Sequence, residues 1–290
     1  MMILVVGATG DLGGKVARTL LAQGRPIRIL VRAQANYQPL AEAGAQVVLG
    51  DLKQRDTLDV ACQGVETIIT TANAVARGGE DTVQTVDLEG NRHLIDAAKA
   101  AGLRQFIFVS MLTADPKSPV PLNQAKGSTE DYLRESGIPH TIFAPNGFME
   151  MMFGAVVGMP AMMGRPVTIV GTGRRKHSFI SVGDVARFLC AAIDNPAAIN
   201  QKFVLGGPQA LSFRAAVAIY ERALGHQLHV SSVAPGEPVP GLPPMFAQVL
   251  AALDAYDSPI DMTETTRTFD IALTSLEEVA RRAVTKAVSA

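Results

Sequence analysis

The sequence predicts an α/β fold, a Rossmann-type doubly wound parallel sheet with a smaller C-terminal substrate lobe. From the N-terminus to about residue 144, short apolar runs rich in β-branched residues alternate with amphipathic segments, which is typical of repeated βα units. A glycine-rich turn directly follows the first of these apolar runs. The amphipathic segments end at glycines placed where a left-handed cap would stop a helix, namely Gly24, Gly44, Gly64, Gly102 and Gly137.

The apolar runs predict six strands in the first half of the chain, at residues 2–6, 26–31, 46–49, 67–71, 105–109 and 140–144. Beyond Pro145 the pattern is less regular, and we expect strands at residues 167–170 and 202–205 and helices at 184–193, 212–224, 245–253 and 275–288. These elements predict a Rossmann domain at residues 1–150 and a smaller lobe at 151–290, with residues of about 180–205 returning to the Rossmann core.

The composition excludes several classes of protein. The 290 residues carry a formal net charge of −1, so no field of one sign is available to attract nucleic acid or anionic lipid, and we expect direct contact with neither. Cys62 and Cys190 are too few for a metal cluster or a disulfide framework, and no metal is expected. The apolar runs are shorter than a signal-peptide core or a membrane span requires, so a cytoplasmic location is expected.

The glycine-rich turn has the sequence VVGATGDLGGKVARTLLAQG and lies between the first strand and the first helix. Glycines at this spacing allow a tight turn, a close approach of the backbone to a pyrophosphate, and close packing of helix on strand. The helix start also offers unpaired N–H groups to an anion. We therefore expect an NAD(P)-binding turn formed by Gly7, Thr9, Gly10, Asp11, Leu12 and Gly13. An ordinary strand-to-helix turn is the alternative, and the absence of Gly-Lys-Ser/Thr excludes a kinase-type P-loop.

The end of the second strand indicates which dinucleotide is bound. An acidic residue about 20 positions beyond the turn would accept hydrogen bonds from the ribose of NAD. This sequence has Arg32 there, in RILVRAQ, and no carboxylate nearby. A guanidinium pairs with the 2′-phosphate of NADP(H), so NADP(H) is favoured over NAD(H). A solvated surface arginine is the alternative.

Two further strand ends belong to the same edge of the predicted sheet. Asp51 and Leu52 follow the third strand, where a carboxylate or its neighbouring backbone could contact the adenine amino group. A helix N-cap or turn residue is an equally good interpretation of Asp51. The small residues Thr71, Ala72 and Asn73 follow the fourth strand and leave room for the ribose and phosphates.

At this point the residues resemble a known family, the NmrA-like group of atypical short-chain dehydrogenases, which includes quinone reductases, triphenylmethane-dye reductases and isoflavone-reductase relatives. The resemblance covers most of the chain. It is carried by GATGDLGG (7–14), LVR (30–32), GD (50–51), FVSM (108–111), EDYLRESGIPHTIFAPNGFME (130–150) and FISVGDVARF (179–188). It implies a Rossmann fold that binds NADP(H), and it is not specific for one reaction.

The resemblance also directs attention to Lys126. Classical members of the larger superfamily use Tyr-x-x-x-Lys, in which the tyrosine is the acid and the lysine lowers the tyrosine pKa and holds the nicotinamide ribose. Here Leu122 stands four positions before Lys126, so the tyrosine is missing, and Tyr132 points about 120° away around the helix and is expected to pack it against the sheet. The resemblance implies that Lys126 bonds the ribose and protonates the substrate directly or through water. A surface lysine in a polar turn is the alternative.

Other site residues are implied less directly. Ser110, at the end of the fifth strand, is expected to orient a substrate carbonyl, and a strand-end cap is the alternative. The resemblance implies nicotinamide contacts for Pro145, Asn146 and Phe148, although Phe148 could equally belong to the core. Thioether-rich residues are expected to line an apolar substrate site, with core packing or a dimer face equally compatible; they are Met149, Met151, Met152, Phe153, Met159, Met162 and Met163.

Two features near residue 180 have simple expected roles. Arg174, Arg175, Lys176 and His177 are expected to form a solvated basic cluster. Asp184 is expected to cap the helix that begins there.

Three functions compete. The leading hypothesis is an oxidoreductase that transfers hydride from NADPH to a small apolar or aromatic acceptor such as a quinone, with a homodimer a further expectation. The second is a non-catalytic NADP(H) redox sensor that regulates a protein partner, which the missing tyrosine favours. A nucleotide-sugar epimerase is weaker, because such enzymes keep the Tyr and Lys pair.

Overall fold

The computed structural model describes residues 1–75 and 77–288, which divide into two compact units. Unit 1 comprises Met1–Ala144 and Val185–Val204, and unit 2 comprises Pro145–Asp184 and Leu205–Ala290. A segment from the second half of the chain therefore completes the N-terminal unit. The change of unit falls after Ala144, six residues before the expected boundary at residue 150.

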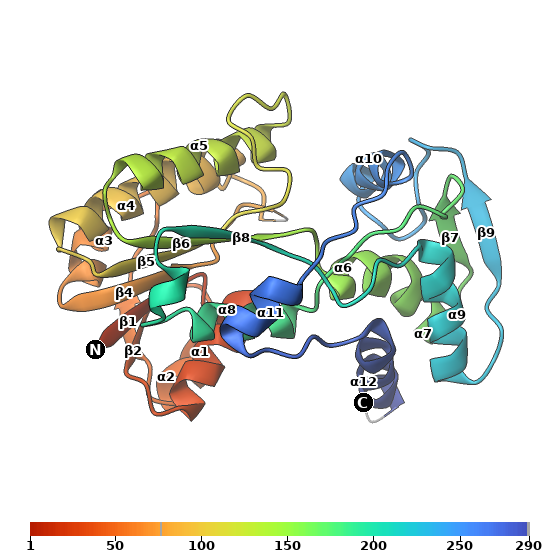
Figure 1. The fold of residues 1–290 in the computed structure, drawn as a ribbon, viewed down its shortest axis with the longest axis horizontal. Helices are drawn as coiled ribbons and strands as arrows, with labels where there is room; N and C mark the ends of the chain where they lie inside the picture. The colour runs from red at the N-terminus through yellow and green to blue at the C-terminus, as the bar shows by residue number, and fades with distance from the viewer. Residues whose placement is uncertain (76, 289–290) are drawn as a thin grey trace. The chain divides into compact units, whose positions relative to one another are not determined.

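A seven-stranded sheet forms the centre of unit 1 (Figure 1). Its order is β3-β2-β1-β4-β5-β6-β8, and the pairs from β3 through β6 are parallel. The strands are β1 (Met2–Val6), β2 (Ile27–Val31), β3 (Gln46–Leu49), β4 (Val65–Thr70), β5 (Gln105–Val109), β6 (His140–Pro145) and β8 (Gln201–Leu205). The order reverses between β1 and β4, which confirms the predicted doubly wound fold.

Helices cover both faces of this sheet. Figure 1 shows α3 (Arg55–Cys62), α4 (Asn91–Ala100) and α5 (Pro121–Glu135) on one face and α1 (Asp11–Ala22) and α8 (Val182–Ala191) on the other. Short elements α2 (Gln38–Glu42), η1 (Val83–Gly90) and η3 (Pro196–Ala198) complete the unit. Because both faces are covered, the β1 residues Ile3, Leu4 and Val5 have no exposed surface. All five predicted cap glycines have positive φ, from 67° to 102°.

The strand register brings the candidate site residues to one edge of the sheet. Val6 pairs with both Leu30 of β2 and Thr70 of β4, so three strands end at the same level. Because parallel strands all point the same way, the residues that follow them lie along the carboxyl edge. The turn after β1, Arg32 after β2 and Thr71 after β4 therefore share that edge.

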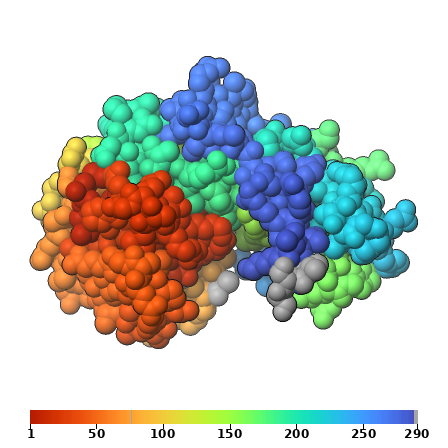
Figure 2. Space-filling view, turned by 90° about the horizontal axis from the view of Figure 1, so that it is seen from below, coloured from red at the N-terminus to blue at the C-terminus, as the bar shows by residue number. Residues whose placement is uncertain are grey.

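Unit 2 is built around a two-stranded parallel sheet of β7 (Val167–Val170) and β9 (Val230–Val233). Its helices are α6 (Met149–Phe153), η2 (Gly154–Gly158), α7 (Met159–Met162), α9 (Phe213–Leu224), α10 (Pro244–Leu253), α11 (Thr263–Phe269) and α12 (Leu276–Val288). In Figure 2 the dark blue surface of α12 borders the cyan surface of α9, against which it packs. The sequence did not predict β9 or α11.

The Met-rich stretch, residues 149–162, is helical, and its methionines lie partly in the core and partly on the surface. Met149 and Met152 are buried in the unit 2 core, whereas Met151, Met159 and Met163 are exposed. The stretch is therefore partly core and partly surface, rather than one continuous lining.

Two expectations near residue 180 are wrong. Helix α8 begins at Val182, so Asp184 lies within its first turn instead of capping it. The Asp184 carboxylate accepts bonds from Thr274 N and Oγ1, both at 2.7 Å. His177 is buried rather than solvated, whereas Arg174–Lys176 are exposed as expected. The Thr274 partner of Asp184 lies 90 positions away in the sequence.

We expect Gly13→Ala to destabilise the protein. A Cβ at Gly13 would lie 2.2 Å from Gly7 O and 2.7 Å from Thr71 Oγ1, and the carbonyl cannot move without opening the turn. The expected cost is about 2–3 kcal/mol of unfolding free energy, as for overpacked cores, measured by urea unfolding. Gly14→Ala is the matched control, since its nearest neighbours, at 3.2 Å, include the flexible Arg18 side chain. A Gly13→Ala variant as stable as this control would contradict the prediction.

Candidate functional site

The turn between β1 and α1 is held by its own backbone. Gly10 N donates to Gly7 O at 3.0 Å, and Gly14 N donates to Gly10 O at 2.8 Å. Gly7 has φ +87°, and a Cβ there would lie 2.7 Å from Thr71 Oγ1. Gly10 is the N-cap of α1 and supplies no side-chain cap. The amides of the first turn of α1 are therefore available to an anion.

A cavity lies beside this turn at the carboxyl edge of the unit 1 sheet. Six of the residues predicted to hold a cofactor line it, namely Gly7, Thr9, Arg32, Asp51, Leu52 and Ala72. Apolar side chains of Val6, Leu30 and Val86 form part of its wall. Polar residues, among them Thr9, Arg32 and Asp51, line it as well, so the cavity offers both polar and apolar contacts to a small molecule.

The other predicted residues at this edge have structural partners. Thr71 Oγ1 donates to Val6 O at 3.3 Å, and Asn73 Oδ1 accepts from Val75 N at 3.0 Å. Asp51 Oδ1 accepts from Lys53 N at 2.9 Å. Asp51 thus forms a turn, and it also lines the cavity.

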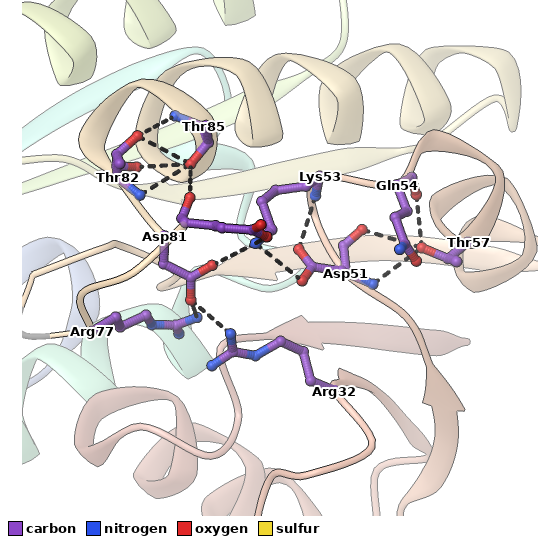
Figure 3. Close-up of polar contacts among 10 residues, drawn as sticks. Arg32, Asp51, Lys53, Gln54, Thr57, Arg77, Asp81, Thr82 and Thr85 are labelled. Carbon is purple, nitrogen blue, oxygen red and sulfur yellow. Dashed lines mark hydrogen bonds and ion pairs between the residues drawn. The ribbon is translucent and has the colours of Figure 1, made fainter.

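Arg32 belongs to a charged cluster at the rim of the cavity (Figure 3). We call Arg32, Lys53, Arg77 and Asp81 the Asp81 cluster. Arg32 Nη1 lies 2.6 Å from Asp81 Oδ2, Lys53 Nζ lies 2.8 Å from Oδ1, and Arg77 Nη1 lies 3.7 Å from Oδ2. The Asp81 side chain is only 6% exposed. One buried carboxylate therefore holds three cations, of which only Arg32 was predicted from the sequence.

The cluster shifts the ionisation of its members. The hydrogen bond from Lys53 and the nearby charges of Arg32 and Arg77 lower the pKa of Asp81, against the opposing effect of its burial. The same hydrogen bond raises the pKa of Lys53. Asp81 is consequently ionised, and Lys53 protonated, at neutral pH.

Lys126 lies in α5 and is buried, with 8% of its side chain exposed, so the surface-lysine alternative is wrong. Its Nζ lies 3.2 Å from Asp87 Oδ1 and donates to Val109 O at 3.3 Å. Asp87, in η1, is fully buried, and its Oδ2 accepts from Ala74 N at 2.9 Å. The ammonium also lies 5.1 Å from the centre of the Phe108 ring. The Lys126–Asp87 pair therefore has a fixed position.

Ser110 donates its hydroxyl to Glu130 Oε1 at 2.5 Å. Glu130, one helical turn beyond Lys126, also accepts from Lys202 Nζ and Arg134 Nη2, both at 2.8 Å. The sequence did not single out Glu130. Arg134 lies four positions away on the same helix, but Ser110 and Lys202 lie 20 and 72 positions away, and no local pattern reports these two pairings.

Tyr132 packs against the core between the helices and the sheet, as expected, and also contacts α4. Its hydroxyl donates to Asp96 Oδ1 of α4 at 2.7 Å, and the Arg92 guanidinium lies 5.1 Å from the centre of its ring. Tyr132 therefore joins α5 to α4 as well as to the core.

Pro145, Asn146 and Phe148 belong to unit 2. Asn146 Nδ2 donates to Ser258 O at 3.1 Å and to Ser258 Oγ at 2.9 Å. Phe148 is half-buried and precedes α6 as its N-cap. Ser258 Oγ also lies 2.7 Å from His177 Nδ1, and Leu253 O lies 3.0 Å from His177 Nε2. Burial lowers the pKa of His177.

Within residues 1–75 and 77–288, no three His, Cys, Asp or Glu side chains are grouped as a metal site. No helix within these ranges has both the length and the hydropathy that spanning a membrane demands.

The chain is similar to several known proteins. A model described as the NmrA-like family matches residues 1–276. The photosystem II assembly factor Ycf39 of Cyanophora paradoxa is 35% identical over 233 residues, 80% of this chain and 72% of that protein. An NAD(P)H azoreductase of Xenophilus azovorans is 32% identical over 234 residues, 80% of this chain and 77% of that protein. The NADPH-dependent quinone oxidoreductase QOR2 of Escherichia coli, solved with NADPH, has a TM-score of 0.80 at 25% identity, covering 97% of this chain and 99% of that one.

We expect His177 to make the protein less stable as the pH falls. In the unfolded chain a histidine takes up a proton near pH 6.5, whereas the lowered pKa of folded His177 delays this uptake. The unfolded state then binds more protons, so the unfolding free energy decreases as the pH falls below about 6.5 toward the folded pKa. Urea unfolding from about pH 7.5 to 5 should show a smaller decrease for His177→Gln than for the wild type.

The control for this series is His226→Gln, which removes a histidine from an exposed position. It should keep the pH dependence of the wild type. Equal pH dependence in His177→Gln and the wild type would refute the assignment to His177.

Proposed function

The chain belongs to the NmrA-like family, and from this membership we propose that it binds NADP(H) at the turn from Gly7 to Gly13 and reduces a small apolar or aromatic acceptor such as a quinone. The observation that carries the proposal is the cavity beside that turn, which six independently predicted cofactor residues line. The quinone oxidoreductase of similar fold was solved with NADPH, and the azoreductase relative is named for use of NAD(P)H, which supports this choice.

The residues present fit the nucleotide. Uncapped amides at the start of α1 suit the pyrophosphate, because they offer N–H groups and the positive end of a helix dipole. Arg32, at the rim of the cavity, suits the 2′-phosphate, since a guanidinium forms charge-assisted bonds with phosphate. The apolar wall suits the adenine ring. NADPH, when bound, supplies the hydride, and the protein supplies position.

Lys126 is proposed to orient the nicotinamide ribose and to deliver a proton to the reduced substrate. Its ammonium is fixed between Asp87 and the Val109 carbonyl, which keeps the donor in one position. With Leu122 in place of the superfamily tyrosine, no phenol stands one turn before Lys126 on this helix face. The proton would therefore pass from the lysine directly or through a water molecule.

A second candidate is a non-catalytic NADP(H) sensor that acts on a protein partner. It is favoured by the pairing of Lys126 with Asp87, which already occupies the ammonium, and by the missing tyrosine. The Ycf39 relative is named an assembly factor, which supports the same alternative. Both candidates require the nucleotide, and only the first requires turnover.

Arg32→Ala tests the choice of nucleotide. We expect it to weaken NADPH binding by about 1.5–3 kcal/mol, the contribution of a hydrogen bond to a charged group. NADH, which lacks the 2′-phosphate, should bind nearly as before. Calorimetry measures both. Arg104→Ala is the control, because Arg104 directly precedes β5, at the opposite edge of the sheet. Equal losses for both nucleotides in Arg32→Ala would rule out a 2′-phosphate contact.

Lys126→Ala tests the reaction. With a panel of quinones, we expect NADPH oxidation to slow by about 10²-fold or more, the usual contribution of general acid–base catalysis. The change leaves Asp87 buried and unpaired, so Lys126→Ala is compared with a Lys126→Ala/Asp87→Asn double variant, which removes that charge. Tight NADPH binding without turnover by the wild type across the panel would favour the sensor over the enzyme.

A further inference from the structure

The cations at the expected 2′-phosphate site are already paired with a carboxylate of the protein. Asp81 bonds Arg32 through one oxygen and Lys53 through the other, and Arg77 lies 3.7 Å from the first. Figure 3 shows the three basic side chains converging on it from separate segments. Arg32 and Arg77 also line the cavity beside the turn.

We propose that Asp81 is an internal counter-ion that holds the 2′-phosphate subsite in the free protein and is displaced when NADPH binds. Lys53 and Arg77 then join Arg32 as ligands of the phosphate. This inference rests on the proposed function. It adds Asp81 as a specificity determinant, because its carboxylate competes with the 2′-phosphate for the same cations.

Charge supports an exchange of partners. A phosphate monoester carries about −1.5 to −2 charges at pH 7 and offers three acceptor oxygens. Three cations suit it better than they suit one carboxylate, which offers two oxygens. Asp81 beside the bound phosphate would be a like charge in a partly buried place, which is unfavourable. The phosphate therefore replaces the carboxylate instead of joining it.

The position of Asp81 in the chain allows the displacement. It follows a turn with two successive left-handed glycines, Gly78 with φ +74° and Gly79 with φ +64°. Within the described part of this turn, residues 77–80 are exposed, and Asp81 N donates to Gly78 O at 3.3 Å. Thr82, directly after Asp81, caps η1 by accepting from Thr85 N at 3.1 Å. Asp81 can thus swing about the glycines while η1 and the sheet remain in place.

The cations already have their positions before any phosphate arrives. Arg32 is 34% exposed and Lys53 26% exposed, so both side chains are held against the protein rather than free in solvent. Holding them costs conformational entropy, which the bonds to Asp81 offset in the free protein. Asp81 therefore preorganises the site and also competes for it.

The test compares Asp81→Asn with Glu80→Gln by calorimetry with NADPH and NADH. Asparagine keeps the shape of Asp81 and removes its charge. We expect the dissociation constant for NADPH to fall about tenfold, as one charge-assisted bond no longer has to be exchanged, and that for NADH to change by less than about twofold. Glu80 is the adjacent carboxylate, 96% exposed and 4.0 Å from Lys53, and its removal should leave both constants within about twofold.

Two further variants separate this inference from its alternatives. In an Arg32→Ala background, Asp81→Asn should tighten NADPH binding less than in the wild type, because part of the exchange is already gone. Lys53→Ala should weaken NADPH more than NADH. Asp81→Ser serves as a second neutral variant if Asp81→Asn does not fold.

The outcomes are distinct. If the wild type binds neither nucleotide, the proposed function fails and this inference fails with it. If the wild type binds NADPH but the neutral Asp81 variants leave its preference over NADH unchanged or lower it, only this inference is overturned. The second result would mean that Asp81 stays in place and orients Arg32 while the nucleotide is bound.

Discussion

The arrangement of unit 1 around the cavity depends on the close contact between the turn after β1 and Thr71, the residue that follows β4. A side chain at Gly13 would meet Gly7 O at 2.2 Å, and one at Gly7 would meet Thr71 Oγ1 at 2.7 Å. Only glycine allows α1 to begin this close to the sheet. That closeness brings uncapped helix amides beside the ends of four parallel strands, where a cavity forms.

One short segment supplies the carboxylates that pair with Arg32 and with Lys126. Asp81 lies just before η1 and Asp87 lies within it. The first pairs with Arg32 at the rim of the cavity and the second with buried Lys126. The two cations singled out in the sequence therefore meet carboxylates from the same stretch of chain.

Local pattern predicted the sheet and the family, because strands and glycine caps depend on residues a few positions apart. The family resemblance is confirmed, and six strands formed within two residues of their expected ends. The side-chain partners that lie far away in the sequence could not be predicted in this way. Arg32 meets Asp81 49 positions away, and His177 meets Ser258 81 positions away. Asp184 looked like a helix cap, yet Thr274, 90 positions away, is its partner. Strand β9, with two exposed serines, lacks the apolar run that marked the others.

A crystal structure of the protein with NADP⁺ tests the central claim most directly. The account predicts pyrophosphate oxygens within hydrogen-bond distance of the amides that open α1, and the 2′-phosphate against the guanidinium of Arg32. A nucleotide bound elsewhere, or a cavity beside Gly7 that stays closed by side chains at saturating nucleotide, would contradict it.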